Sequence, residues 1–180
     1  MGVDLHVLFI CTGNICRSPT AERLAVALGV ERRIHNFAAS SAGTRAVIGH
    51  AMHPEAAQVL RNLGGDPSGF AARQLTPAIA GGADLVLTMT RAHLDTVLEY
   101  APRQFRKTFT LSEAALMATQ NAPCSVADLA ALRAGRAEPA ADVPDPIGQN
   151  PQMYAEVGSQ IARLLPPIIG MCERIAAAGD

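Results

Sequence analysis

The chain has 180 residues, of which 49% are hydrophobic and 17% charged. This balance is typical of one compact globular domain and excludes a largely disordered chain. Fifteen basic and 16 acidic side chains leave a net charge of −1, so the broad basic surface of a nucleic-acid-binding protein is not expected. No apolar run is long enough to span a membrane, and the first residues predict neither a secretory signal nor myristoylation.

Cysteine usage indicates the compartment. The four cysteines are too few and too unevenly spaced for a disulfide framework, so we expect a cytoplasmic protein. In a reducing compartment, cysteine more often serves chemistry than cross-linking. The four are Cys11, Cys16, Cys124 and Cys172.

Short apolar runs alternate with helical patterns along the chain, which predicts a parallel sheet covered by helices on both faces. Residues 5–10 predict a buried first strand. Residues 18–28 predict a helix with Ser18 as its N-cap, Pro19 in its first turn and Gly29 as its stop. The further predictions are a strand at 37–41, a helix at 54–63, a strand at 84–89, a helix at 91–99, a fourth strand at 107–111 and a last helix from 150 onward.

These elements predict a single α/β domain over residues 1–180, with a four-stranded parallel sheet flanked by helices on both faces. Residues 119–141 are rich in alanine and small polar residues. We expect them to form a surface insertion with one short helix at 125–133. No internal repeat suggests a solenoid.

Residues 11–19, with the sequence CTGNICRSP, are the most informative segment. They lie where a buried strand passes into a helix, the place at which open parallel sheets bind ligands. Successive backbone N–H groups and the helix dipole favour an anion there. The segment has neither the Gly-Lys-Ser/Thr of ATP-binding loops nor the three spaced glycines of dinucleotide-binding loops. A different anion chemistry is therefore expected.

Cys11 and Arg17, the first and seventh residues of this segment, suggest a nucleophile inside an oxyanion cradle. Cysteine attacks as a thiolate, a form that a helix N-terminus and a nearby arginine favour. Arg17 has the planar fork that makes two contacts with phosphate oxygens. Gly13 allows a tight turn, and Ser18 is placed to donate its hydroxyl to the sulfur.

With these residues, the chain resembles the bacterial branches of the low molecular weight protein tyrosine phosphatase family. The resemblance covers nearly the whole chain. It implies a phosphoric monoester hydrolase that acts on phosphotyrosine proteins and needs neither a metal nor another cofactor. The other stretches that carry the resemblance are SAGT at 41–44, ARQL at 72–75, DLVL at 84–87 and Asp145-Pro146.

The resemblance implies a role for each site residue. Cys11 would attack phosphorus and form a phosphocysteine, which water then hydrolyses. Arg17 and the loop amides would hold the phosphate oxygens. Asp145, rather than the nearby Asp142, would be the general acid and then the general base. The phosphate-binding loop would comprise Thr12, Gly13, Asn14, Ile15, Cys16 and Ser18, and Asn14, Ser18 and Ser41 would form the supporting network.

The resemblance also implies that Cys16 forms a reversible disulfide with Cys11, which would protect Cys11 from irreversible oxidation. Packing beneath the loop is an equal alternative, because free cysteine usually behaves as a small buried hydrophobe. Since Cys11 must be ionised while Asp145 is protonated, we expect activity to peak on the acid side of neutrality.

The sequence departs from the family pattern around the pocket. Many members have one or two tyrosines after the Asp-Pro pair, where this chain has Ile147 and Gly148. The opposite wall is expected near Val47, and Phe70 stands where a histidine is often found. Aliphatic contacts are therefore expected to replace flat aromatic stacking on the substrate.

Other activities remain open. The corresponding loop of bacterial protein arginine phosphatases resembles this one but carries threonine at the position of Ile15. The apolar side chain of Ile15 favours a phenyl ester as the substrate. Phosphotyrosine is thus preferred, with a bacterial tyrosine kinase as a candidate partner. Arsenate reductase would need a relay of further cysteines, and Cys124 and Cys172 lack paired spacing. A non-enzymatic phosphoprotein-binding role would not require Asp145.

Several histidines and arginines lie outside the motifs. A zinc site of Cys11 and Cys16 with two histidines is disfavoured, because those histidines lack helical i, i+4 spacing. The histidines without a motif are expected to be packed or solvated. Two arginines after predicted strands are candidates for contacting acidic residues beside the phosphorylated one. The two histidines of the zinc alternative are His50 and His53, and those without a motif are His6, His35 and His93. The two arginines are Arg45 and Arg91.

Overall fold

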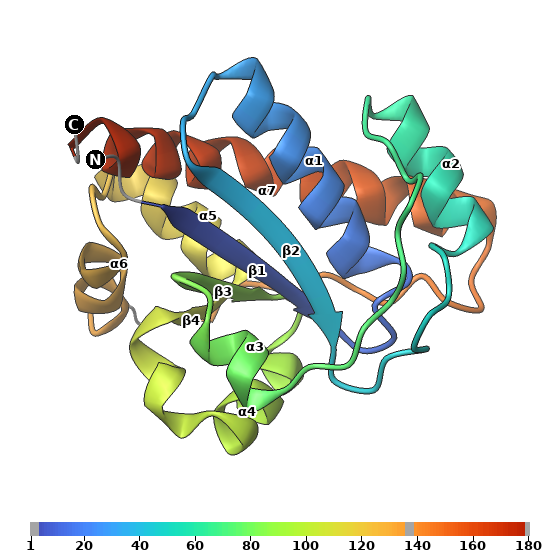
Figure 1. The fold of residues 1–180 in the computed structure, drawn as a ribbon, viewed down its shortest axis with the longest axis horizontal. Helices are drawn as coiled ribbons and strands as arrows, with labels where there is room; N and C mark the ends of the chain where they lie inside the picture. Colours follow the sequence, from blue (N-terminus) through green and yellow to red (C-terminus); the bar gives the residue numbers. More distant parts are fainter. Residues whose placement is uncertain (1–3, 136–138, 179–180) are drawn as a thin grey trace.

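The computed structural model describes residues 4–135 and 139–178, which form one sheet with helices on both faces (Figure 1). The sheet has four parallel strands in the order β2-β1-β3-β4, so the predicted fold class is confirmed. The strands are β1 (Leu5–Cys11), β2 (Phe37–Gly43), β3 (Leu85–Thr88) and β4 (Thr108–Thr110).

Seven α-helices and one 3-10 helix are present among the described residues. Helices α1, α5 and α7 pack on one face of the sheet, while α3 and α4 cover the other. The helices are α1 (Arg17–Glu31), α2 (Pro54–Asn62), α3 (Pro77–Gly81), α4 (Arg91–Tyr100), the 3-10 helix η1 (Pro102–Lys107), α5 (Leu111–Asn121), α6 (Val126–Arg133) and α7 (Pro151–Ala178).

From Val7 onward the central strand β1 is buried on both faces, which explains why residues 7–11 are all apolar. Side chains alternate across a strand. Val7 and Phe9 therefore enter the larger core with α1, α5 and α7, and Leu8 and Ile10 enter the smaller core beneath α3 and α4. This double burial fixes the carboxyl end of β1, where the CTGNICRSP segment begins.

Two predictions about α1 are wrong. Its N-cap is Cys16, and Ser18 lies inside the first turn because its hydroxyl contacts Cys11 and Asn14 instead of the helix end. The helix also continues past Gly29 to Glu31. Glycine is needed there for space, since a Cβ would lie 2.6 Å from Cδ1 of Phe37.

The sequence patterns did not predict α3, η1 or α5, and the predicted fourth strand extends one residue into α5. Helix α5 begins with a capping box in which Thr110 and Glu113 exchange hydrogen bonds. Its exposed face includes Leu116, so the polar stripe that marks a surface helix is interrupted. The buried residues are Leu111, Glu113, Ala114, Ala115, Met117 and Ala118.

Residues 119–141 are partly integrated into the domain. The first three close α5, and the predicted short helix is present as α6. Leu129 of α6 is fully buried in the larger core. The Arg133 guanidinium lies 4.0 Å from the centre of the Phe109 ring and pairs with Glu113 at 3.2 Å. Residues 136–138 lie outside the described part of the chain.

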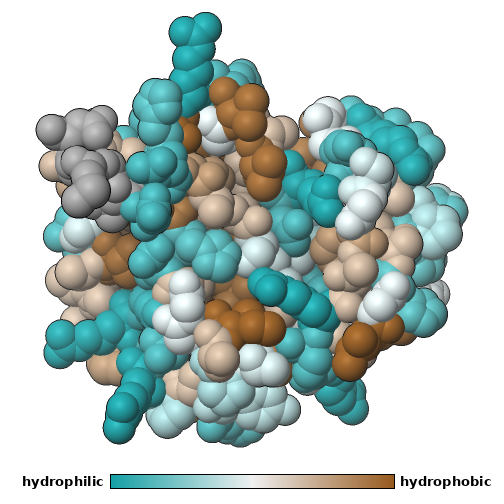
Figure 2. Space-filling view, in the orientation of Figure 1, coloured by the Kyte–Doolittle hydropathy of each residue, from teal (hydrophilic) through white to brown (hydrophobic). Residues whose placement is uncertain are grey.

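The last helix, α7, packs against α1, α2 and α5, and it passes behind α1 in the view of Figure 1. It continues through Pro166 and Pro167. No helix of residues 4–135 and 139–178 combines the length and apolarity that a membrane span requires. On the face shown in Figure 2, hydrophobic residues form small patches among hydrophilic ones.

Gly158 of α7 is a close contact point with α2, because a Cβ there would overlap Cγ1 of Val59. Valine is short and stiff, so Gly158→Ala is expected to lower the free energy of unfolding by about 1–3 kcal/mol. Gly170 in the same helix is the matched control, since a Cβ would meet only the ends of arginine side chains. Gly170→Ala is expected to raise the free energy of unfolding by about 0.5–1 kcal/mol. Urea denaturation measures both effects, and equal effects would contradict this packing.

Candidate active site

The CTGNICRSP segment forms a tight loop between β1 and α1 at the carboxyl edge of the sheet. Cys11 is the last residue of β1, and Arg17 is the first residue of α1. Both side chains are buried, at 2% and 4% exposure. The loop thus encloses both side chains at the carboxyl end of β1.

Asn14 holds the loop in shape. Its backbone lies in the left-handed region, with φ of 56°, which a non-glycine residue adopts only at a cost. Three hydrogen bonds to its side chain offset that cost. Nδ2 donates to Ser18 Oγ (2.9 Å) and Ser41 Oγ (2.8 Å), and Oδ1 accepts from the backbone N–H of Arg73 (2.9 Å). The structure thus brings Asn14, Ser18 and Ser41 together through hydrogen bonds.

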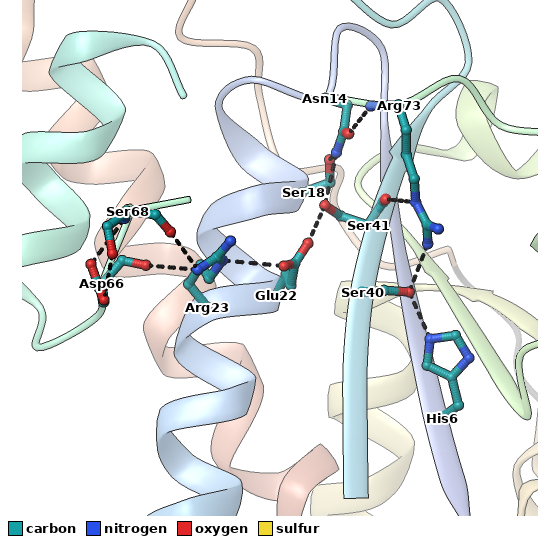
Figure 3. Close-up of polar contacts among 10 residues, drawn as sticks. All are labelled: His6, Asn14, Ser18, Glu22, Arg23, Ser40, Ser41, Asp66, Ser68 and Arg73. Carbon is teal, nitrogen blue, oxygen red and sulfur yellow. Dashed lines mark hydrogen bonds and ion pairs between the residues drawn. The ribbon is translucent and has the colours of Figure 1, made fainter. Parts of the chain in front are cut away.

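These contacts determine the direction of each hydrogen bond (Figure 3). Asn14 Nδ2 donates to both serines, and the Ser41 hydroxyl donates to Glu22 Oε2 at 2.5 Å, because a carboxylate can only accept. The Ser18 proton is then free for Cys11 Sγ, which lies 2.9 Å from Ser18 Oγ. Ser18 is thus oriented to stabilise a thiolate on Cys11.

Glu22 was missed at the sequence level. Its position on α1, one turn after Ser18, was the available signal, but a helical glutamate usually faces solvent. Arg23 pairs with Glu22 at 3.2 Å and lies over the Phe70 ring at 5.6 Å. Glu22 thus contacts Ser41 through one carboxylate oxygen and Arg23 through the other.

Arg17 joins two segments: the CTGNICRSP loop, which we call the phosphate loop, and residues 142–146, which we call the acid loop after the role expected of Asp145. Its Nη2 lies 3.2 Å from Oδ2 of Asp145, and its Nη1 donates to the Val143 carbonyl at 3.1 Å. The Asp145 side chain is half exposed, at 51%. Asp142 instead accepts the backbone N–H of Arg91 at 2.9 Å. The structure therefore groups Cys11, Arg17 and Asp145, whereas Asp142 binds the backbone at the start of α4.

The mouth of the site is aliphatic. Val47 donates its N–H to the carbonyl of Gly13 at 3.0 Å, which confirms that this residue lies beside the loop. Val47, Ile48 and Ile147 are exposed at 38%, 68% and 46%. Gly43, at the end of β2, has no room for a Cβ because one would overlap the Thr12 carbonyl.

The other cysteines are poorly suited to a relay. Burial raises the pKa of Cys16 to about 12, and the charges of Cys11 and Asp145 add to the increase. Burial likewise raises the pKa of Cys172 to about 12, so both thiols stay protonated near neutral pH. Cys124 is exposed on the connection before α6. The role of Cys16 as a redox partner stays a prediction.

Two histidines near the loop contact it in ways that no sequence motif indicated. The backbone N–H of His53 donates to the Ile15 carbonyl at 2.8 Å, and the His53 ring stacks on the Tyr154 ring with their centroids 5.0 Å apart. His93 contacts the Thr12 hydroxyl. Within residues 4–135 and 139–178, no three His, Cys, Asp or Glu side chains are grouped as metal ligands.

The Ser18 contact generates a prediction about Cys11 reactivity. In a Cys124→Ser background, Ser18→Ala is expected to slow alkylation of Cys11 by iodoacetamide about ten-fold near neutral pH, because a charge-assisted hydrogen bond to the thiolate is lost. Ser40→Ala is the matched control, since Ser40 contacts His6 and Arg73 rather than Asn14. Mass spectrometry of the Cys11 peptide gives both rates. An unchanged rate in Ser18→Ala would exclude this contact as a source of thiolate stabilisation.

Comparison with known proteins identifies the family. The sequence model of a family described as low molecular weight phosphotyrosine protein phosphatase matches residues 6–129. The low molecular weight protein-tyrosine-phosphatase Etp of Escherichia coli K12 is 36% identical over 107 residues, which are 59% of this chain and 69% of Etp.

Solved structures agree. A low molecular weight protein tyrosine phosphatase from T. tengcongensis has a TM-score of 0.74 and 31% identity, covering 92% of this chain and 97% of that one. The YwlE arginine phosphatase from Geobacillus stearothermophilus has a TM-score of 0.71 and 26% identity, covering 92% and 90%. The chain therefore belongs to the low molecular weight phosphotyrosine protein phosphatase family and is a cysteine-dependent phosphoric monoester hydrolase.

Proposed function

We propose that this phosphatase hydrolyses phosphotyrosine in proteins through a phosphocysteine on Cys11. One observation carries the proposal: the half-exposed carboxylate of Asp145 lies 3.2 Å from Arg17 at the mouth of the loop that encloses Cys11. A nucleophile, an oxyanion-binding arginine and a proton donor then face one reacting phosphate.

The first half-reaction transfers the phosphoryl group to sulfur. Arg17 and the loop N–H groups bind the three non-bridging oxygens. The Cys11 thiolate attacks phosphorus, the bond to the phenolic oxygen breaks, and Asp145 gives its proton to that oxygen. Ser18 stabilises the thiolate before the attack through its 2.9 Å contact.

The second half-reaction releases phosphate. Asp145, now a carboxylate, takes a proton from a water molecule that attacks the phosphocysteine. The phosphorus–sulfur bond breaks, inorganic phosphate leaves, and Cys11 is regenerated as a thiolate. Both halves use the same grouping of Cys11, Arg17 and Asp145.

The ion pair of Arg17 and Asp145 links substrate binding to acid catalysis. A phosphate dianion bound by Arg17 competes with Asp145 for the guanidinium. An activity maximum on the acid side of neutrality is expected, because the reacting complex needs an ionised Cys11 and a protonated Asp145.

The aliphatic mouth supports phosphotyrosine as the substrate. Ile15, Val47 and Ile147 offer apolar side chains to a flat, apolar phenyl ring, and none of them offers a hydrogen-bond acceptor to a guanidinium. The second candidate is a protein arginine phosphatase, favoured by the overlap with the YwlE structure at a TM-score of 0.71.

The substrate proposal is tested by kcat/KM on matched phosphotyrosine and phosphoarginine peptides. We expect the phosphotyrosine peptide to react at least about ten-fold faster, because Ile15, Val47 and Ile147 leave part of a substrate guanidinium without hydrogen-bond acceptors, whereas they can pack against a phenyl ring. Ile15→Thr is the informative variant, since it adds a hydroxyl beside the substrate and should narrow the ratio. A faster phosphoarginine reaction in the unmodified protein would assign it to the arginine phosphatases instead.

The acid is tested with Asp145→Asn. On a phosphotyrosine peptide, kcat is expected to fall by about 10²–10⁴, because the phenolic oxygen then leaves without a proton. The loss should be smaller on p-nitrophenyl phosphate, whose leaving group needs less protonation. Asp142→Asn is the matched control, because its side-chain oxygen can still accept from Arg91. A larger loss in Asp142→Asn would reverse the assignment.

The setting of the enzyme is also part of the proposal. Residues 1–180 are proposed to act as one catalytic domain, with a phosphotyrosine protein as partner and a bacterial tyrosine kinase as a candidate. The free thiols of Cys11 and Cys16 support a reducing, cytoplasmic compartment. Arg45 and Arg91 are exposed beside the loops at the mouth, where they can meet acidic residues of the partner.

A further inference from the structure

His93 connects the second face of the sheet to the phosphate loop. It lies in the first turn of α4, is 7% exposed, and its Nε2 is 2.8 Å from Oγ1 of Thr12. Thr12 directly follows Cys11. Its carbonyl accepts the N–H of Arg45 at 3.0 Å. Thr12 is therefore held through its side chain by α4 and through its backbone by the segment after β2.

The charge state of His93 suits this position. Burial lowers the pKa of His93 to about 4, and the positive charge of Arg17 acts in the same direction, whereas Asp145 and Asp142 oppose the shift. The ring is thus neutral at the pH at which phosphatases of this chemistry work. It adds no second positive charge to compete with Arg17 for phosphate oxygens.

The environment of His93 does not favour it for stability alone. Its other ring nitrogen, Nδ1, is buried and has no hydrogen-bond partner within the described residues. A buried polar atom without a partner destabilises a fold by about 1–3 kcal/mol. An apolar side chain at this position would avoid that cost, so the contact between Nε2 and Thr12 is the feature that a histidine specifically provides.

The same segment of chain supports the acid loop. The Met89 carbonyl accepts the N–H of Val143 at 2.9 Å, and the N–H of Arg91 donates to Asp142 at 2.9 Å. Residues 89–93 therefore contact the acid loop at two points and the phosphate loop through His93. A shift of this segment would change the position of Asp145 relative to the phosphate loop.

We propose that His93 is a positioning residue of the phosphatase reaction: through Thr12, it fixes the first backbone amide after Cys11 relative to the segment that carries the acid loop. His93 touches neither the phosphate nor the leaving group. Its contribution is to the placement of the oxyanion-binding amide in the transition state, where a small displacement lowers the rate. The inference rests on the proposed attack by Cys11.

Four variants test this role: His93→Gln, His93→Asn, Thr12→Val and the double variant of the last two. Glutamine places its amide nitrogen near the position of Nε2, whereas asparagine is too short to reach Thr12. With p-nitrophenyl phosphate, His93→Asn and Thr12→Val are each expected to lower kcat about ten-fold, equivalent to one hydrogen bond, with KM changed less than about two-fold. His93→Gln is expected to retain most of the activity.

Two readouts separate positioning from general destabilisation. In the double variant the loss should equal that of the worse single variant, because His93 acts through Thr12. Inhibition by vanadate, which mimics the transition state, should weaken about ten-fold, and inhibition by phosphate should weaken much less. A merely structural role would weaken both inhibitors equally.

The proposal is overturned if the two single losses multiply, if His93→Gln is as slow as His93→Asn, or if Thr12→Val keeps the full kcat. Should His93→Asn fail to fold, Thr12→Val and His93→Gln still decide. Since p-nitrophenyl phosphate reports the Cys11 chemistry alone, these outcomes do not depend on the peptide preference. Loss of all turnover in Cys11→Ser is the separate check on the proposed nucleophile.

Discussion

The left-handed backbone of Asn14 is the constraint on which the site depends. This conformation turns the loop back on itself, and the three hydrogen bonds of the side chain hold it there. Their partners come from α1, β2 and the segment at Arg73. The reactive loop therefore exists only when these three parts of the chain have assembled, which makes the site a product of the whole fold rather than of one motif.

Two supports stand on opposite sides of this loop. On one side, Glu22 and Ser41 orient the hydrogen bonds that end at Cys11. On the other, residues 89–93 hold both Thr12 and the acid loop. In the proposed mechanism, the first support orients Ser18 toward the nucleophile, and the second sets the position of Asp145 relative to the loop. Different parts of the chain would thus control the nucleophile and the acid.

The sequence predicted the four strands and singled out Cys11, Arg17 and Asp145, which the structure groups, because both leave local signals. Residues 7–11 of β1 are all apolar, and the loop after them has a distinctive order of residue types. The errors arise where tertiary contacts determine the local structure. The Ser18 hydroxyl contacts Cys11 instead of capping the helix, and Gly29 makes room for the Phe37 ring instead of ending the helix. His93 could not be found locally, since its contact with Thr12 spans 81 positions.

The aliphatic mouth differs from the layer beneath it in what a mutation there would disturb. Val47, Ile48 and Ile147 are exposed, and substitutions at such positions usually change stability by less than about 0.5 kcal/mol. Asn14 and Gly43, in contrast, are confined by backbone and by buried hydrogen bonds. Substrate preference can therefore evolve by single steps at the rim while the chemistry below stays intact, and the same division shows a protein engineer where selectivity is open to change.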